Sequence, residues 1–414
     1  MAALIGLALA IFLIVKKLSP VYSLMLGALA GGLLAGLPLE ATVGQMFDGV
    51  RSITPAILRI LAAGVLSGAL IETGAAASIA GGIARSFGSR HIYLALALST
   101  MLLCAAGVFV DVSVITVAPV ALMLGRKLNA PRLKLLLAMI GGGKCGNIMS
   151  PNPNTIIAAE NYGAPLSSVM AAGIIPALIG LAVTVYVLVP LLPFKTVDNE
   201  LEETEKDVNG DRLPSFIASV SGPLVAIFLL ALRPLFGFVV DPLVALPAGG
   251  LVTVLATGSW RRAGQCLSSG LAKMTPVAVL LVGTGTIAGV ISASDMKDVV
   301  LGALDSWSIG ALFIAPLSSI LMSAATASTT AGATISSSSF SATVLEAGVD
   351  GAWAASMTNA GATVLDHLPH GSFFHATGGS VGAAFKDRLK LIPFESVIGL
   401  TLAGLSLLLS VLFA

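Results

Sequence analysis

Fourteen apolar segments dominate this chain, seven before a polar linker and seven after it. A segment of about 20 apolar residues can cross a bilayer as an α-helix, and lipid-exposed backbone must satisfy its own hydrogen bonds. Only 10% of the residues are charged, against about 25% in soluble domains. These features predict an all-α polytopic membrane protein. The segments cover residues 2–15, 19–38, 54–73, 92–109, 111–125, 133–158, 170–193, 214–239, 242–258, 275–293, 309–323, 330–345, 352–378 and 392–413.

The remaining composition argues against several other classes of protein. The net charge is +1 and no basic patch stands out, so no nucleic-acid partner is expected. The three cysteines are scattered without a CxxC motif, which implies neither a disulfide framework nor a metal site. We expect no cofactor. The N-terminus lacks a basic region and a cleavage site, so we expect residues 2–15 to be a retained helix.

The two halves of the chain share motifs at an offset close to 220 residues, which indicates an internal duplication. Residues 1–194 are predicted to form the first repeat and residues 214–414 the second, with the acidic linker 195–213 between them. The recurring features are Thr54-Pro55 and Thr275-Pro276, Gly68 and Gly289, Gly44-Gln45 and Gly264-Gln265, and the 40-residue spacings from Asp111 to Pro151 and from Thr329 to Pro369.

Residues 92–126 and 309–345 each contain two apolar limbs around a tip of small residues, which favours re-entrant hairpins. Each half then crosses the membrane five times, so the second repeat is inverted relative to the first, as in many secondary transporters. This predicts about ten transmembrane helices, two re-entrant hairpins and broken helices at the membrane midplane. The alternative, in which every limb spans and each half crosses seven times, remains open.

The positive-inside rule gives an orientation in the cell (inner) membrane. With both termini outside, 17 of the 22 Lys and Arg residues lie inside, two lie outside, and Arg59, Lys144 and Arg233 lie within spans. The linker 195–213 is then cytoplasmic. The seven-crossing alternative places the basic cluster Arg126–Lys134 on the same side, so charge alone does not exclude it.

A polar, proline-containing stretch breaks the apolar segment 133–160. Pro151 and Pro153 disfavour a continuous helix, and non-helical backbone at membrane depth survives only where protein buries it or it lines a cavity. A half-helix starting near Thr155 would offer its N-terminus to an anion. Lys144 is either a counter-charge for that anion, a snorkelling residue, or the partner of an acid elsewhere. The candidate substrate-binding residues here are Lys144, Asn147, Ser150, Asn152, Asn154 and Thr155.

A second polar break lies within residues 352–378, in Leu365-Asp-His-Leu-Pro-His-Gly-Ser372. Histidine titrates near neutral pH, so Asp366, His367 and His370 are candidate proton carriers, and His370 and Ser372 are also candidate substrate ligands. A metal site is the alternative, although no thiolate or second cluster supports one. His375 is expected at a helix surface.

Both hairpin tips carry polar groups. Asp111 is a lone carboxylate in an apolar run, and burial favours its neutral form, so it is a candidate proton carrier as well as a substrate ligand beside Ser113. Its alternative role is to cap the return limb. The second tip is rich in small hydroxyl residues, with Thr326, Ser328 and Thr329 as candidate ligands, or as packing residues.

On these residues the sequence resembles the gluconate permease family of the ion-transporter superfamily. The resemblance covers most of the chain and is clearest over residues 64–92, 107–123, 146–159 and 324–400. It implies a proton symporter for sugar acids, a homodimer through a scaffold part, and a moving transport part that contains both hairpins and both broken helices. The pair Asn154-Thr155 is similar to signatures of related sodium-coupled carboxylate transporters.

Together these patterns predict a secondary active transporter, not an enzyme. The expected substrate is a small organic anion such as gluconate or a related hydroxy-carboxylate, carried with a proton by alternating access. A sodium-coupled carboxylate transporter is the main alternative, and an anion channel is a further one.

Overall fold

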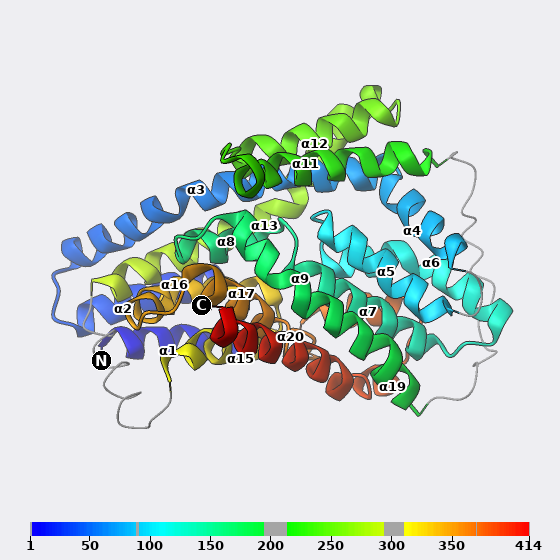
Figure 1. Cartoon of the computed structure of the whole chain (residues 1–414). Helices are drawn as coiled ribbons and strands as arrows, with labels where there is room; N and C mark the ends of the chain where they lie inside the picture. Colours follow the sequence, from blue (N-terminus) through cyan, green and yellow to red (C-terminus); the bar gives the residue numbers. More distant parts are fainter. Residues whose placement is uncertain (1, 88–90, 194–212, 294–309, 370, 414) are drawn as a thin grey trace.

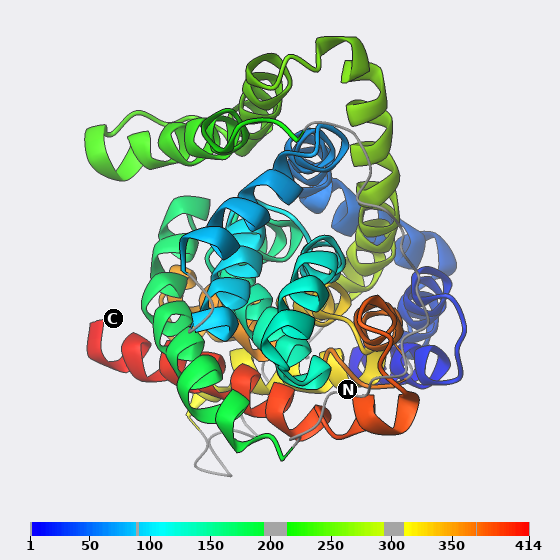
Figure 2. The same ribbon diagram turned by 90° about the vertical axis from the view of Figure 1, so that its right-hand side faces the viewer.

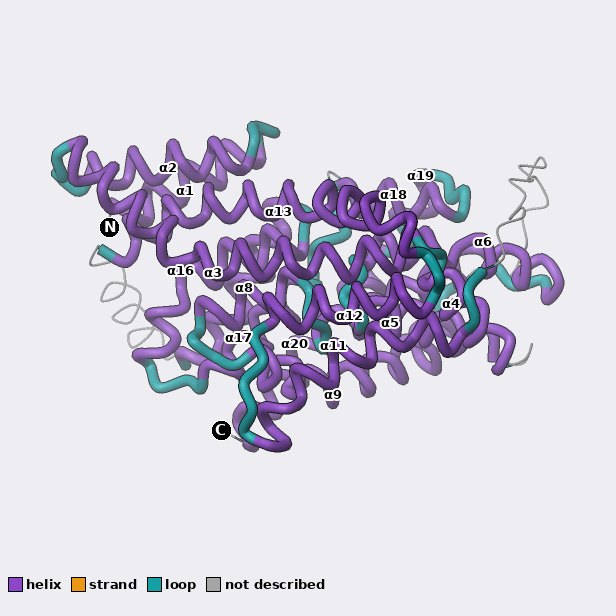
Figure 3. Tube along the Cα trace, turned by 90° about the horizontal axis from the view of Figure 1, so that it is seen from above, coloured by secondary structure: helices purple, strands orange, loops and turns teal. Residues whose placement is uncertain are grey.

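The computed structural model describes residues 2–87, 91–193, 213–293, 310–369 and 371–413. The described residues form helices joined by loops and contain no strand (Figure 3), which confirms the prediction of an all-α membrane protein. The helices of eight or more residues are α1 Ala2–Val15, α2 Pro20–Leu34, α3 Leu39–Glu72, α4 Ala75–Ser86, α5 Ile92–Ala105, α6 Val110–Leu128, α7 Arg132–Ile148, α8 Pro153–Asn161, α9 Leu166–Val183, α11 Phe216–Phe236, α12 Pro242–Ala256, α13 Ala263–Ser292, α15 Ile314–Thr326, α16 Thr329–Glu346, α17 Gly351–Ala362, α18 Ser372–Ser380 and α20 Ile392–Phe413.

Among the described residues, four stretches are long and apolar enough to cross a membrane by length and composition alone: 39–72, 166–191, 260–291 and 385–413. The last three join short helical elements to α9, α13 and α20. The short helix in the last is α19, Phe385–Leu389. Helices α1, α2, α5, α11, α12 and α15 are apolar but shorter. The break residues divide two of the predicted spans into α7–α8 and α17–α18, so neither half of a broken helix has spanning length.

Helices α3 and α13 are longer than the predicted spans 54–73 and 275–293. Their first turns contain polar residues, such as Gln45 and Asp48 in α3, so hydropathy alone started both predicted segments too late. Both helices also continue through an internal proline, Pro55 or Pro276. Helix α4 was not predicted at all, because its small residues resemble a connecting loop.

The centre of the fold is the antiparallel packing of α3 against α13. A Cβ atom built on Gly49 would lie 2.1 Å from the carbonyl oxygen of Gly285, and one built on Gly68 would lie 2.1 Å from that of Cys266. Small residues permit this close backbone approach between membrane helices. Long α3 runs past the helices of both halves in Figure 1.

Several packing contacts are reciprocal between the two halves. Helix α2 packs on α13, and its counterpart α12 packs on α3. Helix α8 packs on α16, and its counterpart α18 packs on α6. Figure 2 shows α11 and α12 as an outlying layer beyond α3. The inverted repeat predicts such exchanged contacts.

The predicted hairpins correspond to the pairs α5–α6 and α15–α16, whose limbs pack against each other. Their tips are tight turns that each contain a residue with positive φ, Gly107 (96°) and Ala327 (45°). Each tip lies beside the break of its own half. A Cβ on Gly107 would lie 3.9 Å from the Pro151 oxygen, and one on Gly371 would lie 2.4 Å from the Ala327 oxygen. The linker 195–213, except residue 213, and His370 lie outside the described residues.

The packing of α3 on α13 generates a prediction. Gly68→Ala should lower the free energy of unfolding by about 1–3 kcal/mol, because the added methyl group collides with backbone atoms that cannot rotate away. Gly44→Ala is the matched control, since a Cβ there meets no atom within 4 Å. Thermal unfolding of both variants in detergent checks this. A Gly68→Ala variant as stable as the Gly44→Ala variant would contradict the packing.

Candidate functional site

The first break begins where α7 ends at Ile148, and α8 starts at Pro153. Proline suits the first helical position because its missing N–H would have no partner there. Asn152 caps α8: its side-chain oxygen accepts a hydrogen bond from the Thr155 backbone N–H at 3.0 Å. The cap explains why the half-helix begins two residues before the predicted start near Thr155. Residues 150–152 of the break are buried inside the protein, and Met149 is partly buried.

Buried amide side chains gather at this break. The Asn147 side-chain oxygen accepts hydrogen bonds from the Nδ2 atoms of Asn152 at 2.5 Å and Asn154 at 3.2 Å. Asn152 Nδ2 also lies 2.7 Å from the Ser150 hydroxyl. Asn359, on α17, donates to the Thr155 hydroxyl at 2.9 Å. This bond joins the first break to the second broken helix.

Three polar atoms of this amide cluster have no hydrogen-bond partner among the described residues. They are Nδ2 of Asn147 and the side-chain oxygens of Asn154 and Asn359. A buried polar atom without a partner costs about 1–3 kcal/mol. One donor and two acceptors are therefore available to groups such as the hydroxyls of a bound molecule.

Lys144 connects the two breaks. Its ammonium group donates to the Thr363 carbonyl oxygen at 2.5 Å, to Asp366 Oδ1 at 2.7 Å and to His367 Nδ1 at 3.0 Å. The Lys144 and Asp366 side chains are only 1% and 3% exposed. Of the roles predicted for Lys144, pairing with an acid is the one adopted in this conformation.

Asp366 links this pair to the second hairpin. The Thr329 hydroxyl, in the first turn of α16, donates to Asp366 Oδ2 at 2.6 Å. Both carboxylate oxygens of Asp366 are therefore engaged, one by the first break and one by the second tip. Three of the four predicted polar elements meet at this carboxylate.

His367 extends the cluster to α20. Its Nε2 lies 3.0 Å from the Ile392 carbonyl oxygen and 3.2 Å from the Ser396 hydroxyl. On the other side of the ring, Nδ1 lies 3.9 Å from Glu395 Oε2. Glu395 is itself paired with buried Arg388. With His367 neutral, two cations and two carboxylates give this buried charge cluster (Lys144, Asp366, His367, Arg388 and Glu395) a net charge of zero.

Other predicted site residues lie outside the charge cluster. The Asp111 carboxylate accepts a hydrogen bond from the Val112 N–H at 2.8 Å in the first turn of α6, where an acid suits the helix dipole. Ser113 is buried, and its hydroxyl oxygen accepts a hydrogen bond from the Cys104 thiol, with 3.3 Å between Sγ and Oγ. Thr326 donates to the Met322 carbonyl, and Ser328 caps α16. Ser372 is exposed at the start of α18.

The histidines do not form a shared metal site in the described residues. His375 is exposed, with Nε2 2.8 Å from the Pro369 carbonyl oxygen, whereas His367 is fully buried. No group of three or more His, Cys, Asp and Glu residues within the described ranges is placed to hold a metal ion.

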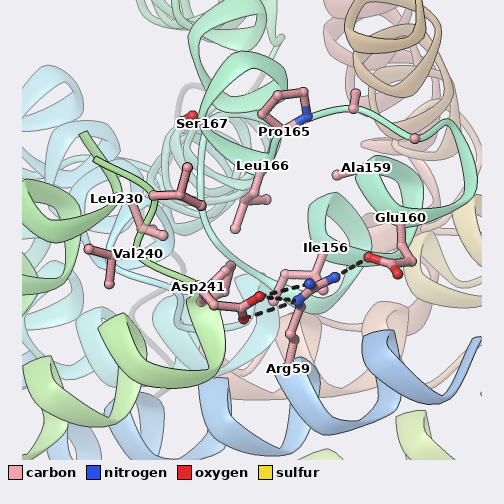
Figure 4. Close-up of a pocket in the computed structure, with 14 residues that line it drawn as sticks. Arg59, Ile156, Ala159, Glu160, Pro165, Leu166, Ser167, Leu230, Val240 and Asp241 are labelled. Carbon is pink, nitrogen blue, oxygen red and sulfur yellow. Dashed lines mark hydrogen bonds and ion pairs between the residues drawn. The ribbon is translucent and has the colours of Figure 1, made fainter. Parts of the chain in front are cut away.

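A second polar feature borders a cavity of about 320 Å³ between α8–α9 and α3, α11 and α12. Figure 4 shows Arg59 of α3 between two carboxylates at this cavity. Its guanidinium donates to Glu160 at the end of α8 and to Asp241 Oδ2, 2.8 Å away, at the start of α12. Arg59 of α3 therefore joins the broken helix, through α8, to α12 of the outlying layer. The cavity walls contain none of the predicted site residues.

Six residues of these clusters were absent from the predicted site: Arg59, Glu160, Asp241, Asn359, Arg388 and Glu395. Asn359 and Glu395 each interrupt a long apolar segment, which is the signal that could have identified them. Arg388 was counted with the cytoplasmic loops, but it is 1% exposed because Glu395 and the Thr377 hydroxyl bind its guanidinium.

Comparisons with known proteins identify relatives over the whole chain. A profile described as GntP family permease matches residues 1–413. A protein of Haemophilus influenzae, known as an uncharacterized transporter, is 52% identical over 410 residues, which cover 98% of this chain and 97% of that protein. A gluconate permease of Pseudomonas aeruginosa is 24% identical over 93% of this chain and 92% of its own. The YdaH transporter of Alcanivorax borkumensis shares the fold, with a TM-score of 0.63 and 18% identity over 89% of this chain and 86% of that one.

The Lys144–Asp366 pair generates a prediction about stability. Asp366→Asn should lower the free energy of unfolding by about 3–5 kcal/mol, because it leaves a buried ammonium group without a counter-charge. Adding Lys144→Gln to that variant should recover part of the loss, since no net charge then remains buried. Denaturant unfolding of the purified variants measures both effects.

The control for this prediction is the pair of Asp387 with Lys390, 2.6 Å apart, whose side chains are 34% and 57% exposed. Asp387→Asn should change stability by less than about 1 kcal/mol. Equal losses for Asp366→Asn and Asp387→Asn, or a double variant less stable than either single one, would contradict the assigned pairing.

Proposed function

Because the chain belongs to the GntP permease family, whose members are membrane transporters, we propose that it carries a small organic anion together with a proton. The observation that carries the proposal is the buried charge cluster at the meeting point of the two breaks. Five ionisable groups lie there with a net charge of zero. Adding a proton creates one positive charge, which an anionic substrate neutralises. Co-binding thus avoids burying net charge.

Gluconate, or a related sugar acid or hydroxy-carboxylate, is the proposed substrate. Relatives named as gluconate permeases support this choice. The chemistry of the two clusters supports it as well, because a cation suits a carboxylate and the free amide atoms of Asn147, Asn154 and Asn359 suit hydroxyls. Further proposed contacts with the substrate come from the two breaks and the second tip: Ser150, Asn152, Thr155, Thr326, Ser328, Thr329 and Ser372. Asp111, Ser113 and His370 remain proposed as well.

Transport by alternating access is proposed to involve two parts of the fold. The hairpins and the broken helices form the transport part, while α3 and α13 with their neighbours form the scaffold. Reciprocal contacts, α2 on α13 and α12 on α3, support the inverted repeat that this mechanism uses. Movement of α8 against the scaffold requires Arg59 to release Glu160. A homodimer through the scaffold is part of the same proposal.

The proposed orientation has both termini outside the inner membrane and the linker 195–213 in the cytoplasm. Its support is the distribution of Lys and Arg described above. Among the candidate proton carriers, Asp366 and His367 lie within the charge cluster, and Asp111 lies outside it.

Sodium coupling is the second candidate, and the first break is the observation that favours it. The side-chain oxygens of Asn154 and Asn359 lack hydrogen-bond partners among the described residues, and the Thr155 hydroxyl lies close by, hydrogen-bonded to Asn359 and Asn152. Neutral oxygen atoms of this kind suit a hard cation. An anion channel would carry substrate without saturation or counterflow.

Uptake of radiolabelled gluconate into proteoliposomes tests the proposal. An inward proton gradient should drive accumulation above the equilibrium level, uptake should saturate, and preloaded gluconate should exchange with external gluconate. Uptake that follows a sodium gradient and ignores pH would overturn proton coupling. Unsaturable flux without exchange would favour a channel and contradict the transporter.

The choice of substrate has a separate test. Thermal unfolding of the purified protein with sugar acids, hydroxy-acids and dicarboxylates should show the largest stabilisation with gluconate or a close relative. A ligand at about 100 times its Kd stabilises the native state by about 2.7 kcal/mol. Stabilisation by dicarboxylates alone, and only with sodium, would identify the second candidate instead.

A further inference from the structure

Every N–H group of Lys144 is already in use in this conformation. An ammonium group has three donors, and here they go to the Thr363 carbonyl oxygen, Asp366 Oδ1 and His367 Nδ1. Lys144 therefore has no donor left for a substrate carboxylate. Its surroundings must change before it can bind one.

The hydrogen bonds of His367 determine which ring nitrogen is protonated. The carbonyl oxygen of Ile392 can only accept a hydrogen bond, so Nε2, 3.0 Å away, carries the ring proton. In neutral His367 the other nitrogen, Nδ1, then has a lone pair. Lys144 donates to that lone pair at 3.0 Å.

A proton added to His367 must bind at Nδ1, and it changes the direction of the hydrogen bond. Protonated Nδ1 becomes a donor, and Asp366 Oδ1 lies 3.1 Å away to accept. Lys144 loses its third acceptor and faces a second positive charge. Lys144 thus gains one free N–H, and the charge cluster gains one unit of positive charge.

Charged groups from every neighbouring element act on this proton. Asp366 beside His367 and Glu395 of α20, whose Oε2 is 3.9 Å from Nδ1, favour protonation. Lys144 of α7 opposes it. Arg388 of α19 is paired with Glu395 and weakens the effect of that carboxylate. Thr329 and Ser396 contribute neutral hydroxyls.

We propose that protonation of His367 at Nδ1 releases one N–H of Lys144 to bind the carboxylate of the transported acid. The proton and the carboxylate bind together because each removes the cost of burying the other's charge. The coupling ratio is one proton per carboxylate, and the pair carries no net charge. This inference rests on the proposed function and assigns its proton carrier, which the sequence left open among Asp111, Asp366, His367 and His370.

Calorimetry of gluconate binding to the purified, full-length protein tests the inference. In a pH range where His367 is neutral, binding should take up about one proton per gluconate, and affinity should rise about tenfold for each unit by which pH falls. Titrations in buffers with different ionisation enthalpies give the proton count. Glucitol, a neutral polyol without a carboxylate, should take up no proton when it binds.

Two histidine variants identify the proton carrier. His367→Asn places an amide near the position of Nδ1, and this group cannot gain a proton near neutral pH. Its gluconate affinity should be independent of pH, and the proton count should be zero. His375→Asn makes the same chemical change at an exposed histidine and should behave like the wild type.

The outcomes separate this inference from the proposed function. Gluconate binding without proton uptake by the wild type would overturn the inference whether or not any variant folds. So would a His367→Asn protein that still takes up one proton, while transport itself would stand in both cases. Absence of gluconate binding at every pH would overturn the proposed substrate and the inference with it.

Discussion

The ion pair between Lys144 and Asp366 is the interaction on which the meeting of the two broken helices depends. Neither charge could be buried alone, since the desolvation of a single ion costs several kcal/mol. The pair lies only 2.7 Å apart, although its residues are 222 positions apart in the chain. Lys144 also binds Thr363, the C-cap of α17, where a cation compensates the negative end of a helix. The Lys144 side chain therefore neutralises the charge of Asp366 and also compensates the C-terminal end of α17.

The rest of the fold divides into regions with different capacity for change. Between α3 and α13 the backbones are in direct contact at glycines, so these helices leave no space for rearrangement. Around the breaks, amide and hydroxyl groups replace that packing, and some of their buried atoms have no hydrogen-bond partner in the part of the chain that the structure describes. This contrast between closely packed helices and a polar centre is what the proposed scaffold and moving part would require. Arg59 lies between these regions, bound to carboxylates on both sides.

Local sequence features predicted the broken helices well, because proline and clustered amides have the same effect in any surroundings. They predicted tertiary partners poorly. Lys144 had several possible partners, and only packing between the repeats selects Asp366. From its sequence context Arg388 was assigned to a loop, whereas in the structure it is buried and paired with Glu395. Asn359 was a single polar residue in an apolar run, and nothing local identified Thr155 as its partner. The long α3 was also underestimated, since its polar first turns extend beyond the apolar stretch that marks a span.

The central claim is that one proton moves with each carboxylate, so the transported pair is electrically neutral. The most direct test measures gluconate accumulation in proteoliposomes while pH gradient and membrane potential are set independently with a potassium ionophore. The account predicts accumulation under an inward proton gradient at zero potential, and none under a potential of either sign at equal pH. Accumulation driven by the membrane potential alone would contradict the proposal that each proton bound by His367 frees one Lys144 N–H for one carboxylate.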